Sequence, residues 1–139
     1  MGRRHIPAAV HVQRSRAGLG LFAEETIEKG QFVIEYTGEL ISNDEADRRG
    51  NKYLFELNSK WTIDGSARSN TARYINHSCR PNCETDVIRR RVKIFAKRRI
   101  KPGEELTYDY GKAYVDEYIK PNGCKCEKCK AKKDATQPS

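Results

Sequence analysis

The sequence predicts a single compact, β-rich α+β domain. A chain of 139 residues is sized for one domain with one modest core. Its β-branched and aromatic runs are short and bounded by turn residues, helical spacing is rare, and no internal repeat divides it. We expect an N-terminal arm at 1–9, the folded domain at 10–111, a cysteine-bearing segment at 112–130 and a disordered polar tail at 131–139.

Composition indicates which partners and which cellular compartment to expect. Hydrophobic residues make up 37% of the chain and the formal net charge is +8, which favours acidic partners such as nucleic acid or a protein bound to it. Five cysteines, three of them close to the C-terminus, fit metal ligation plus a spare thiol better than a disulfide framework. With no signal-peptide pattern and no membrane-spanning apolar run, we expect a soluble intracellular protein, in the cytoplasm or the nucleus.

The first half of the chain contains strand, turn and helix signals. Residues 10–20 read as a β-hairpin or loop whose glycines would let the backbone approach a ligand closely. Residues 32–36 alternate between two largely apolar faces, which predicts a central strand. Ser42 and Glu45 form a capping box and Gly50 a stop signal, so we expect a short helix at 44–49.

The second half predicts further short elements. Residues 53–57 and 61–64 read as a β-hairpin, and 66–75 as a short helix. Strands at 87–88 and 92–96 flank three consecutive arginines, 89–91, which are either a solvated turn or a docking site.

The stretch from Arg73 to Asn82 concentrates groups able to bind a ligand. Asn76 and His77 offer amide and imidazole atoms, and Cys79 offers a potential thiolate. The same residue types are common in ordinary turns, so the stretch alone leaves both interpretations open.

Four motifs in order resemble the SET-domain protein-lysine methyltransferases, which use S-adenosylmethionine. They are Gly-Leu-Gly at 18–20, Tyr-Thr-Gly at 36–38, Asn-His-Ser-Cys-Arg-Pro-Asn at 76–82 and Thr-Tyr-Asp-Tyr-Gly at 107–111. The resemblance implies that 10–111 is a SET domain of several small sheets, with a C-terminal pseudoknot that brings the last motif past Asn76. It also implies that 112–130 is a post-SET zinc segment.

The resemblance assigns roles to particular residues. Methyl transfer to lysine is an in-line displacement that needs aligned reactants, a neutral amine and exclusion of water. Tyr110 matches the catalytic tyrosine, and Tyr108 the position that governs product state, which implies a mono- or dimethylating enzyme. Channel positions are matched by Tyr36, Tyr53, Phe55 and Tyr108, although each could equally be a core residue. Cofactor positions are matched by Gly18, Leu19, Gly20, Arg73, Asn76 and His77.

The C-terminal thiols predict a zinc site. Cys124, Cys126 and Cys129 are one ligand short of a tetrahedral site, and the resemblance supplies Cys79 as the fourth. Two residues separate Cys126 from Cys129, fewer than is usual in the family, so a different ligand set is open. Cys83 is either a substitute ligand or a small buried residue.

The resemblance leaves the protein substrate open. Histone-like tails and other basic or nucleic-acid-associated proteins with an exposed lysine are compatible with it. The competing interpretation is a catalytically inert, zinc-stapled module that docks nucleic acid or chromatin.

Overall fold

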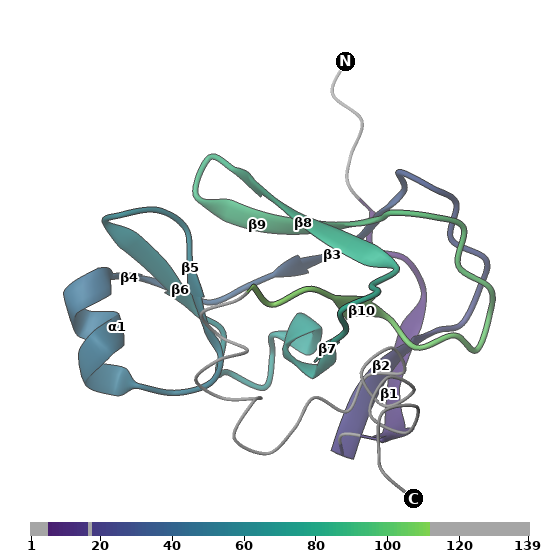
Figure 1. Ribbon diagram of the computed structural model, residues 1–139, viewed down its shortest axis with the longest axis horizontal. Helices are drawn as coiled ribbons and strands as arrows, with labels where there is room; N and C mark the ends of the chain where they lie inside the picture. Colours follow the sequence, from purple (N-terminus) through teal and green to yellow (C-terminus); the bar gives the residue numbers. More distant parts are fainter. Residues whose placement is uncertain (1–5, 17, 112–139) are drawn as a thin grey trace, which may run out of the picture.

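The computed structural model describes residues 6–16 and 18–111, which form four small sheets, one α-helix and one 3-10 helix (Figure 1). The elements are β1 (Val10–Ser15), β2 (Gly18–Ala23), β3 (Phe32–Tyr36), β4 (Glu39–Ser42), α1 (Asn43–Arg49), β5 (Leu54–Glu56), β6 (Trp61–Asp64), η1 (Thr71–Tyr74), β7 (Asn76–His77), β8 (Cys83–Ile88), β9 (Arg91–Ala96) and β10 (Thr107–Tyr108). The predicted β-rich α+β class with several small sheets is confirmed.

The first sheet is the antiparallel hairpin of β1 and β2, as predicted. Its outermost pair joins Ser15 to Gly18, so the glycines belong to β2. Gly18 has a φ of 102°, in the left-handed region that glycine tolerates best. The following residues of β2, Leu21 to Ala23, are buried and anchor the hairpin to the core.

The prediction that residues 32–36 form a central strand is wrong. The second sheet has the order β3-β9-β8, so β9 is central and β3 pairs with β9 alone among the described strands. Both faces of β3 are nevertheless largely buried, with Val33 at 0% and Tyr36 at 4% exposure. A register shift between Phe32 and Ile34 lets Val33 reach the core without a cross-strand partner. Burial on both faces therefore came from tertiary packing and not from a central place in a sheet.

The third sheet, of order β4-β6-β5, carries α1 at its edge, and here the local predictions are confirmed. The Ser42 hydroxyl accepts a hydrogen bond from the Glu45 amide at 3.1 Å, which is the expected N-cap. Gly50 ends the helix with a φ of 58° and donates its N–H to the Ala46 carbonyl. Strands β5 and β6 form the predicted hairpin.

The helix predicted at 66–75 is shorter than expected, because only Thr71–Tyr74 is helical and it is a 3-10 turn. The preceding residue, Asn70, is 1% exposed. Its side-chain carbonyl accepts from the Thr37 N–H and its side-chain amide donates to the Gly65 carbonyl, both at 3.0 Å. These two bonds tie 66–70 to neighbouring loops, so this segment takes no helical conformation.

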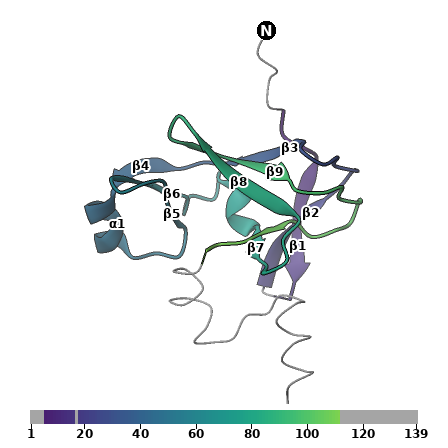
Figure 2. The same cartoon turned by 45° about the horizontal axis from the view of Figure 1, so that its top comes forward.

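The fourth sheet is the two-residue parallel pair of β7 and β10 near the middle of the molecule (Figures 1 and 2). It lies against a core to which Leu21, Ile75, Ile94, Ile100 and Leu106 contribute fully buried side chains. The C-terminal motif therefore lies beside the Asn76 stretch, as the resemblance implies. In the part of the chain that the structure describes, no helix is long and apolar enough to cross a bilayer.

Candidate functional site

The parallel pair of β7 and β10 brings together the two motifs that the sequence places far apart. Asn76 pairs with Thr107 and His77 with Tyr108. The Ser78 N–H donates to the Tyr108 carbonyl at 3.2 Å, which extends the pairing by one bond. Through this backbone contact the Asn76 and His77 side chains lie close to the Tyr108–Gly111 end of the chain.

His77 is held as a neutral imidazole facing Tyr110. Its Nδ1 accepts the Tyr110 N–H at 3.0 Å, which leaves the ring proton on Nε2, 3.4 Å from the Cys79 sulfur. Burial lowers the pKa of His77, opposed by the charge of Asp109, whose Oδ1 lies 3.8 Å from Nδ1. The imidazole thereby fixes the backbone that carries the predicted catalytic tyrosine.

Asn76 connects the glycine hairpin to the C-terminal motif. Its Nδ2 lies 3.0 Å from the Ser15 hydroxyl, 3.0 Å from the Leu19 carbonyl and 2.8 Å from a Glu105 carboxylate oxygen. That carboxylate lies so close to Gly20 that a Cβ there would stand 2.4 Å from Glu105 Oε2. The predicted cofactor residues of 18–20 and Asn76 are therefore brought together by the structure.

Glu105 is a site residue that sequence reasoning missed. It directly precedes the Leu-Thr-Tyr-Asp-Tyr run, but neither its spacing nor its residue type distinguishes it from Glu104 beside it, which bonds to Arg98 instead. Its position under Gly20 and its contact with Asn76 arise only from the fold.

The aromatic residues predicted for a substrate channel belong to two adjoining groups. In the first, the Tyr108 and Tyr110 ring centroids are 4.8 Å apart, and the Tyr110 hydroxyl donates to the Ile75 carbonyl. In the second, Tyr36 and Phe55 are 5.6 Å apart. Tyr36 and Tyr108 are buried members of one core cluster, and Phe55 and Tyr110 pack against it. The structure therefore shows these four rings in or against the core, and their role as walls of a substrate channel stays a prediction.

Tyr53, the fifth candidate wall, is joined to the second group through its backbone. The Tyr36 hydroxyl donates to the Tyr53 carbonyl at 2.7 Å. The Tyr53 ring itself faces two cations, Lys52 at 5.3 Å and Arg73 at 4.4 Å from its centroid. Burial would raise the pKa of the Tyr53 phenol, but the hydrogen bond from Arg73 and the charge of Lys52 outweigh burial and lower it.

Arg73, predicted to be near the cofactor, is positioned against Tyr53. Its guanidinium also lies 5.3 Å from the Tyr74 ring centroid, and it donates to the Tyr53 hydroxyl at 3.3 Å and to the Ser66 carbonyl. One polar atom of this group, Nε, is buried and has no hydrogen-bond partner among the described residues. These contacts place Arg73 beside the candidate channel.

The two cysteines that the structure describes differ in environment. Cys79 is half-buried, with its sulfur 3.4 Å from His77 Nε2, whereas Cys83 is 0% exposed within the core. Burial raises the pKa of the Cys83 thiol to about 12, which makes it an inert small core residue and a poor substitute ligand. Cys124, Cys126 and Cys129 lie outside the described residues. Residues 6–16 and 18–111 hold no group of three or more His, Cys, Asp or Glu side chains able to bind a metal.

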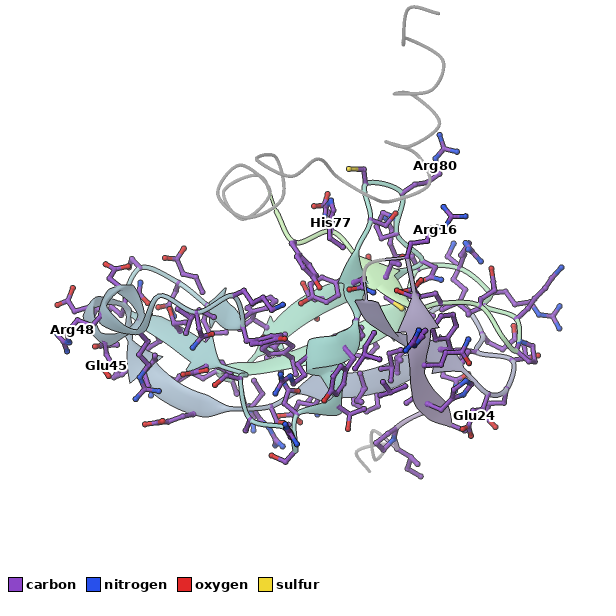
Figure 3. The ribbon with its side chains drawn as sticks, turned by 90° about the horizontal axis from the view of Figure 1, so that it is seen from below. Arg16, Glu24, Glu45, Arg48, His77 and Arg80 are labelled. Carbon is purple, nitrogen blue, oxygen red and sulfur yellow. The ribbon has the colours of Figure 1, made fainter. Side chains whose placement is uncertain are left out.

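The labelled charges of Figure 3 show how the site lies in the molecule. His77, Arg16 and Arg80 are on the same side, while Glu45 and Arg48 of the α1 region lie at the far end. Arg16 follows β1, and Arg80 lies in the loop after β7, so two exposed arginines lie near the elements that carry the candidate cofactor residues.

Comparison with known proteins identifies related sequences. The sequence pattern of the SET domain matches residues 18–111. The chain is 42% identical over 125 residues to the histone-lysine N-methyltransferase trithorax of Drosophila virilis, covering 81% of this chain and 3% of that protein. It is 44% identical over 117 residues to the H3 lysine-4 specific histone-lysine N-methyltransferase of Schizosaccharomyces pombe, covering 75% and 12%. The chain thus spans a small fraction of these relatives.

Solved structures give the same result. The polycomb repressive complex 2 of Chaetomium thermophilum contains a chain that superposes with a TM-score of 0.71 at 41% identity, over 77% of this chain and 16% of that one. A ctPRC2 structure in an autoinhibited conformation bound to S-adenosylmethionine gives a TM-score of 0.70 at 37% identity, over 84% and 17%.

Proposed function

The chain belongs to the SET-domain family, and on that basis we propose that it is an S-adenosylmethionine-dependent protein-lysine N-methyltransferase. The observation that carries the proposal is the β7–β10 pair, which sets Asn76 and His77 beside Tyr108 and Tyr110. Relatives named histone-lysine methyltransferases and a neighbouring structure bound to S-adenosylmethionine support it.

The residues present fit the cofactor. Gly18 is exposed with a left-handed φ, and a Cβ built there would meet no atom within 4 Å, so open backbone lies at the start of β2. Asn76 ties this backbone to the C-terminal motif through the Leu19 carbonyl. We propose that Gly18, Leu19, Gly20, Asn76 and His77 hold S-adenosylmethionine, which when bound supplies an electrophilic methyl group. The contacts of Arg73 favour a role at Tyr53 instead.

The aromatic groups would receive the substrate lysine. An apolar, water-poor surround disfavours the ammonium form of the amine, which must be neutral to attack a methyl carbon. Tyr36, Tyr53 and Phe55 would line the approach, and Tyr110 would orient the amine. Tyr108, only 6% exposed, would limit the space available to a methylated amine, so we propose mono- or dimethyl-lysine as the product.

We propose further that residues 112–130 form a post-SET segment whose Cys124, Cys126 and Cys129 bind zinc with Cys79. A half-buried thiol on the loop after β7 fits a ligand shared with a later segment. Residues 1–9 would then be an arm, 10–111 the SET domain and 131–139 a tail. Metal analysis tests the ligand set: wild type should hold one zinc per chain, and Cys79→Ser and Cys126→Ser should each lose it while Cys83→Ala retains it.

For the substrate we propose a histone-like or other basic, nucleic-acid-associated protein, which would place the enzyme with chromatin. The Schizosaccharomyces pombe relative is named as specific for H3 lysine 4, and one similar ctPRC2 structure is of a complex with H3K27me3. Mass spectrometry after incubation with S-adenosylmethionine and a proteome extract should show methylated lysines. Tyr110→Phe should lose most transfer and keep cofactor binding, because only a hydroxyl is removed. Cofactor binding without any methylated product in wild type would favour the inert docking module.

A further inference from the structure

The turn between β8 and β9 has an unusual sequence for its geometry. Arg89 and Arg90 alone join the strands, with φ values of 51° and 65°. A two-residue hairpin with two left-handed positions is a type I′ turn. Asn-Gly is strongly preferred there because a Cβ atom clashes with the backbone at positive φ, which Gly avoids and Asn tolerates better than most residues. The sequence therefore keeps two arginines at positions where they weaken the hairpin.

The turn also projects from its sheet. Strand β3 pairs with β9 no further than Tyr36 opposite Val92, whereas β8 and β9 continue to the pair Ile88 and Arg91. Figures 1 and 2 both show the loop end of this hairpin standing clear of the other ribbons. The two arginines of the turn are exposed and form a narrow tip.

The charge at this tip is not neutralised by neighbouring acids. Arg91 is paired with Glu35, its Nε lying 3.0 Å from a carboxylate oxygen. By contrast, no ion pair with Arg89 or Arg90 is found in residues 6–16 and 18–111. The Arg90 guanidinium lies over the Trp61 ring, 5.4 Å from its centroid. This cation–π contact holds the Arg90 side chain in place, and its positive charge is kept. Two positive charges are thus presented together at a protruding point.

We propose that the β8–β9 tip, meaning Arg89 and Arg90, contacts the phosphate backbone of a duplex nucleic acid. Guanidinium groups bind phosphate oxygens through paired hydrogen bonds, and adjacent ones can engage neighbouring phosphates. The net charge of +8 attracts such a polyanion at long range. This contact goes beyond lysine methylation: it would hold the enzyme on nucleic acid near a nucleic-acid-bound substrate.

The turn geometry supplies a test variant that does not threaten the fold. Arg89→Asn with Arg90→Gly installs the preferred type I′ sequence and removes both charges, so thermal stability should rise by several degrees while nucleic-acid binding falls. Arg89→Lys with Arg90→Lys keeps the charges. Lys29→Gln with Lys97→Gln removes two exposed charges elsewhere, for which no ion pair is found in residues 6–16 and 18–111, and serves as the matched control.

Binding is measured on the full chain by fluorescence anisotropy with a short labelled duplex DNA, across a salt series and without S-adenosylmethionine. The Asn-Gly variant should bind about tenfold more weakly near 0.1 M salt, and its log–log salt slope should be shallower by about two, as expected for two lost phosphate contacts. The Lys-Lys variant and the control pair should stay within about threefold of wild type.

Two outcomes would overturn the proposal. One is unchanged DNA affinity and salt slope in the Asn-Gly variant. The other is that the Asn-Gly variant keeps its DNA affinity but binds poly-glutamate, measured in the same way, more weakly than wild type. That result would identify the tip as a site for acidic polypeptides. Because binding is read without methyl transfer, failure here leaves the proposed catalytic function untouched, and an inactive enzyme that binds DNA through the tip would leave this proposal intact.

Discussion

Asn82 is the side chain whose loss should best reveal how the site is held together. It is 4% exposed and bonds to the strand before Tyr108 from both ends of its amide. Its Nδ2 donates to the Glu105 carbonyl at 2.8 Å, and its Oδ1 accepts the Thr107 N–H at 2.9 Å. Asn82→Ala removes both bonds and leaves the Glu105 carbonyl and the Thr107 N–H, which are partly buried, without these partners.

The expected loss in the free energy of unfolding follows from these two bonds. Each hydrogen bond contributes about 1 kcal/mol, and a buried polar group left unpaired costs about 1–3 kcal/mol, so we expect a loss of about 2–4 kcal/mol. For a domain of this size that corresponds to a melting temperature lower by roughly 10 °C. Because the same bonds fix the segment leading to Tyr108 and Tyr110, affinity for S-adenosylmethionine should fall as well.

A matched variant separates stability from function. Asn43 also makes two amide bonds, donating to the Asn58 carbonyl at 2.9 Å and accepting from the Thr62 hydroxyl at 2.7 Å, but it lies at the start of α1, beside the third sheet. Asn43→Ala should therefore lower the free energy of unfolding without changing cofactor affinity. Denaturant unfolding and calorimetric titration with S-adenosylmethionine measure the two quantities. The reasoning fails if Asn82→Ala unfolds like wild type, or if both variants weaken cofactor binding equally.

Three further predictions concern single side chains. Arg73→Met should raise the KM for a lysine peptide several-fold and change the Kd for S-adenosylmethionine by less than about twofold, and Arg73→Lys should have an intermediate KM. A large loss of cofactor affinity would instead show that Arg73 contacts the cofactor. Tyr108→Phe should shift products toward higher methylation several-fold, since one hydrogen bond of about 1 kcal/mol is lost; unchanged methyl states by mass would contradict this. Cys83 in the native protein should resist a thiol reagent until the protein unfolds. Its pKa is raised to about 12, so above pH 9 only the unfolded state ionises this thiol and the free energy of unfolding should decline. The same decline in a Cys83→Ala variant would exclude this cause.

The sequence predicted best those features whose causes are local. The helix α1 begins and ends where Ser42, Glu45 and Gly50 predict, because a cap hydrogen bond and a left-handed stop involve residues a few positions apart. The prediction of the β5–β6 hairpin is confirmed for the same reason. Its Asn58 side chain accepts the N–H groups of Lys60 and Trp61, which fixes the turn from within.

Features that depend on distant residues could not be derived from local patterns. An apolar alternation shows that β3 is buried on both sides but not what covers it, so the prediction of a central strand failed. The shortened helix before Asn76 reflects bonds from Asn70 to Thr37 and Gly65, which no helical period reveals. The pairing of β7 with β10 joins residues about thirty positions apart, and only the family resemblance indicated it.

The same long-range pairing explains why the candidate site needs so many supporting side chains. A parallel pair of two residues per strand has few backbone bonds of its own, and parallel pairing is slightly weaker per residue than antiparallel. Asn82 clamps β10 from one side, while Asn76 and Glu105 tie the pair to the glycine hairpin on the other. The geometry of the site is therefore set by amide and carboxylate contacts. Loss of Asn82 or Glu105, neither of which we propose to contact the cofactor, should lower activity through the position of this pair.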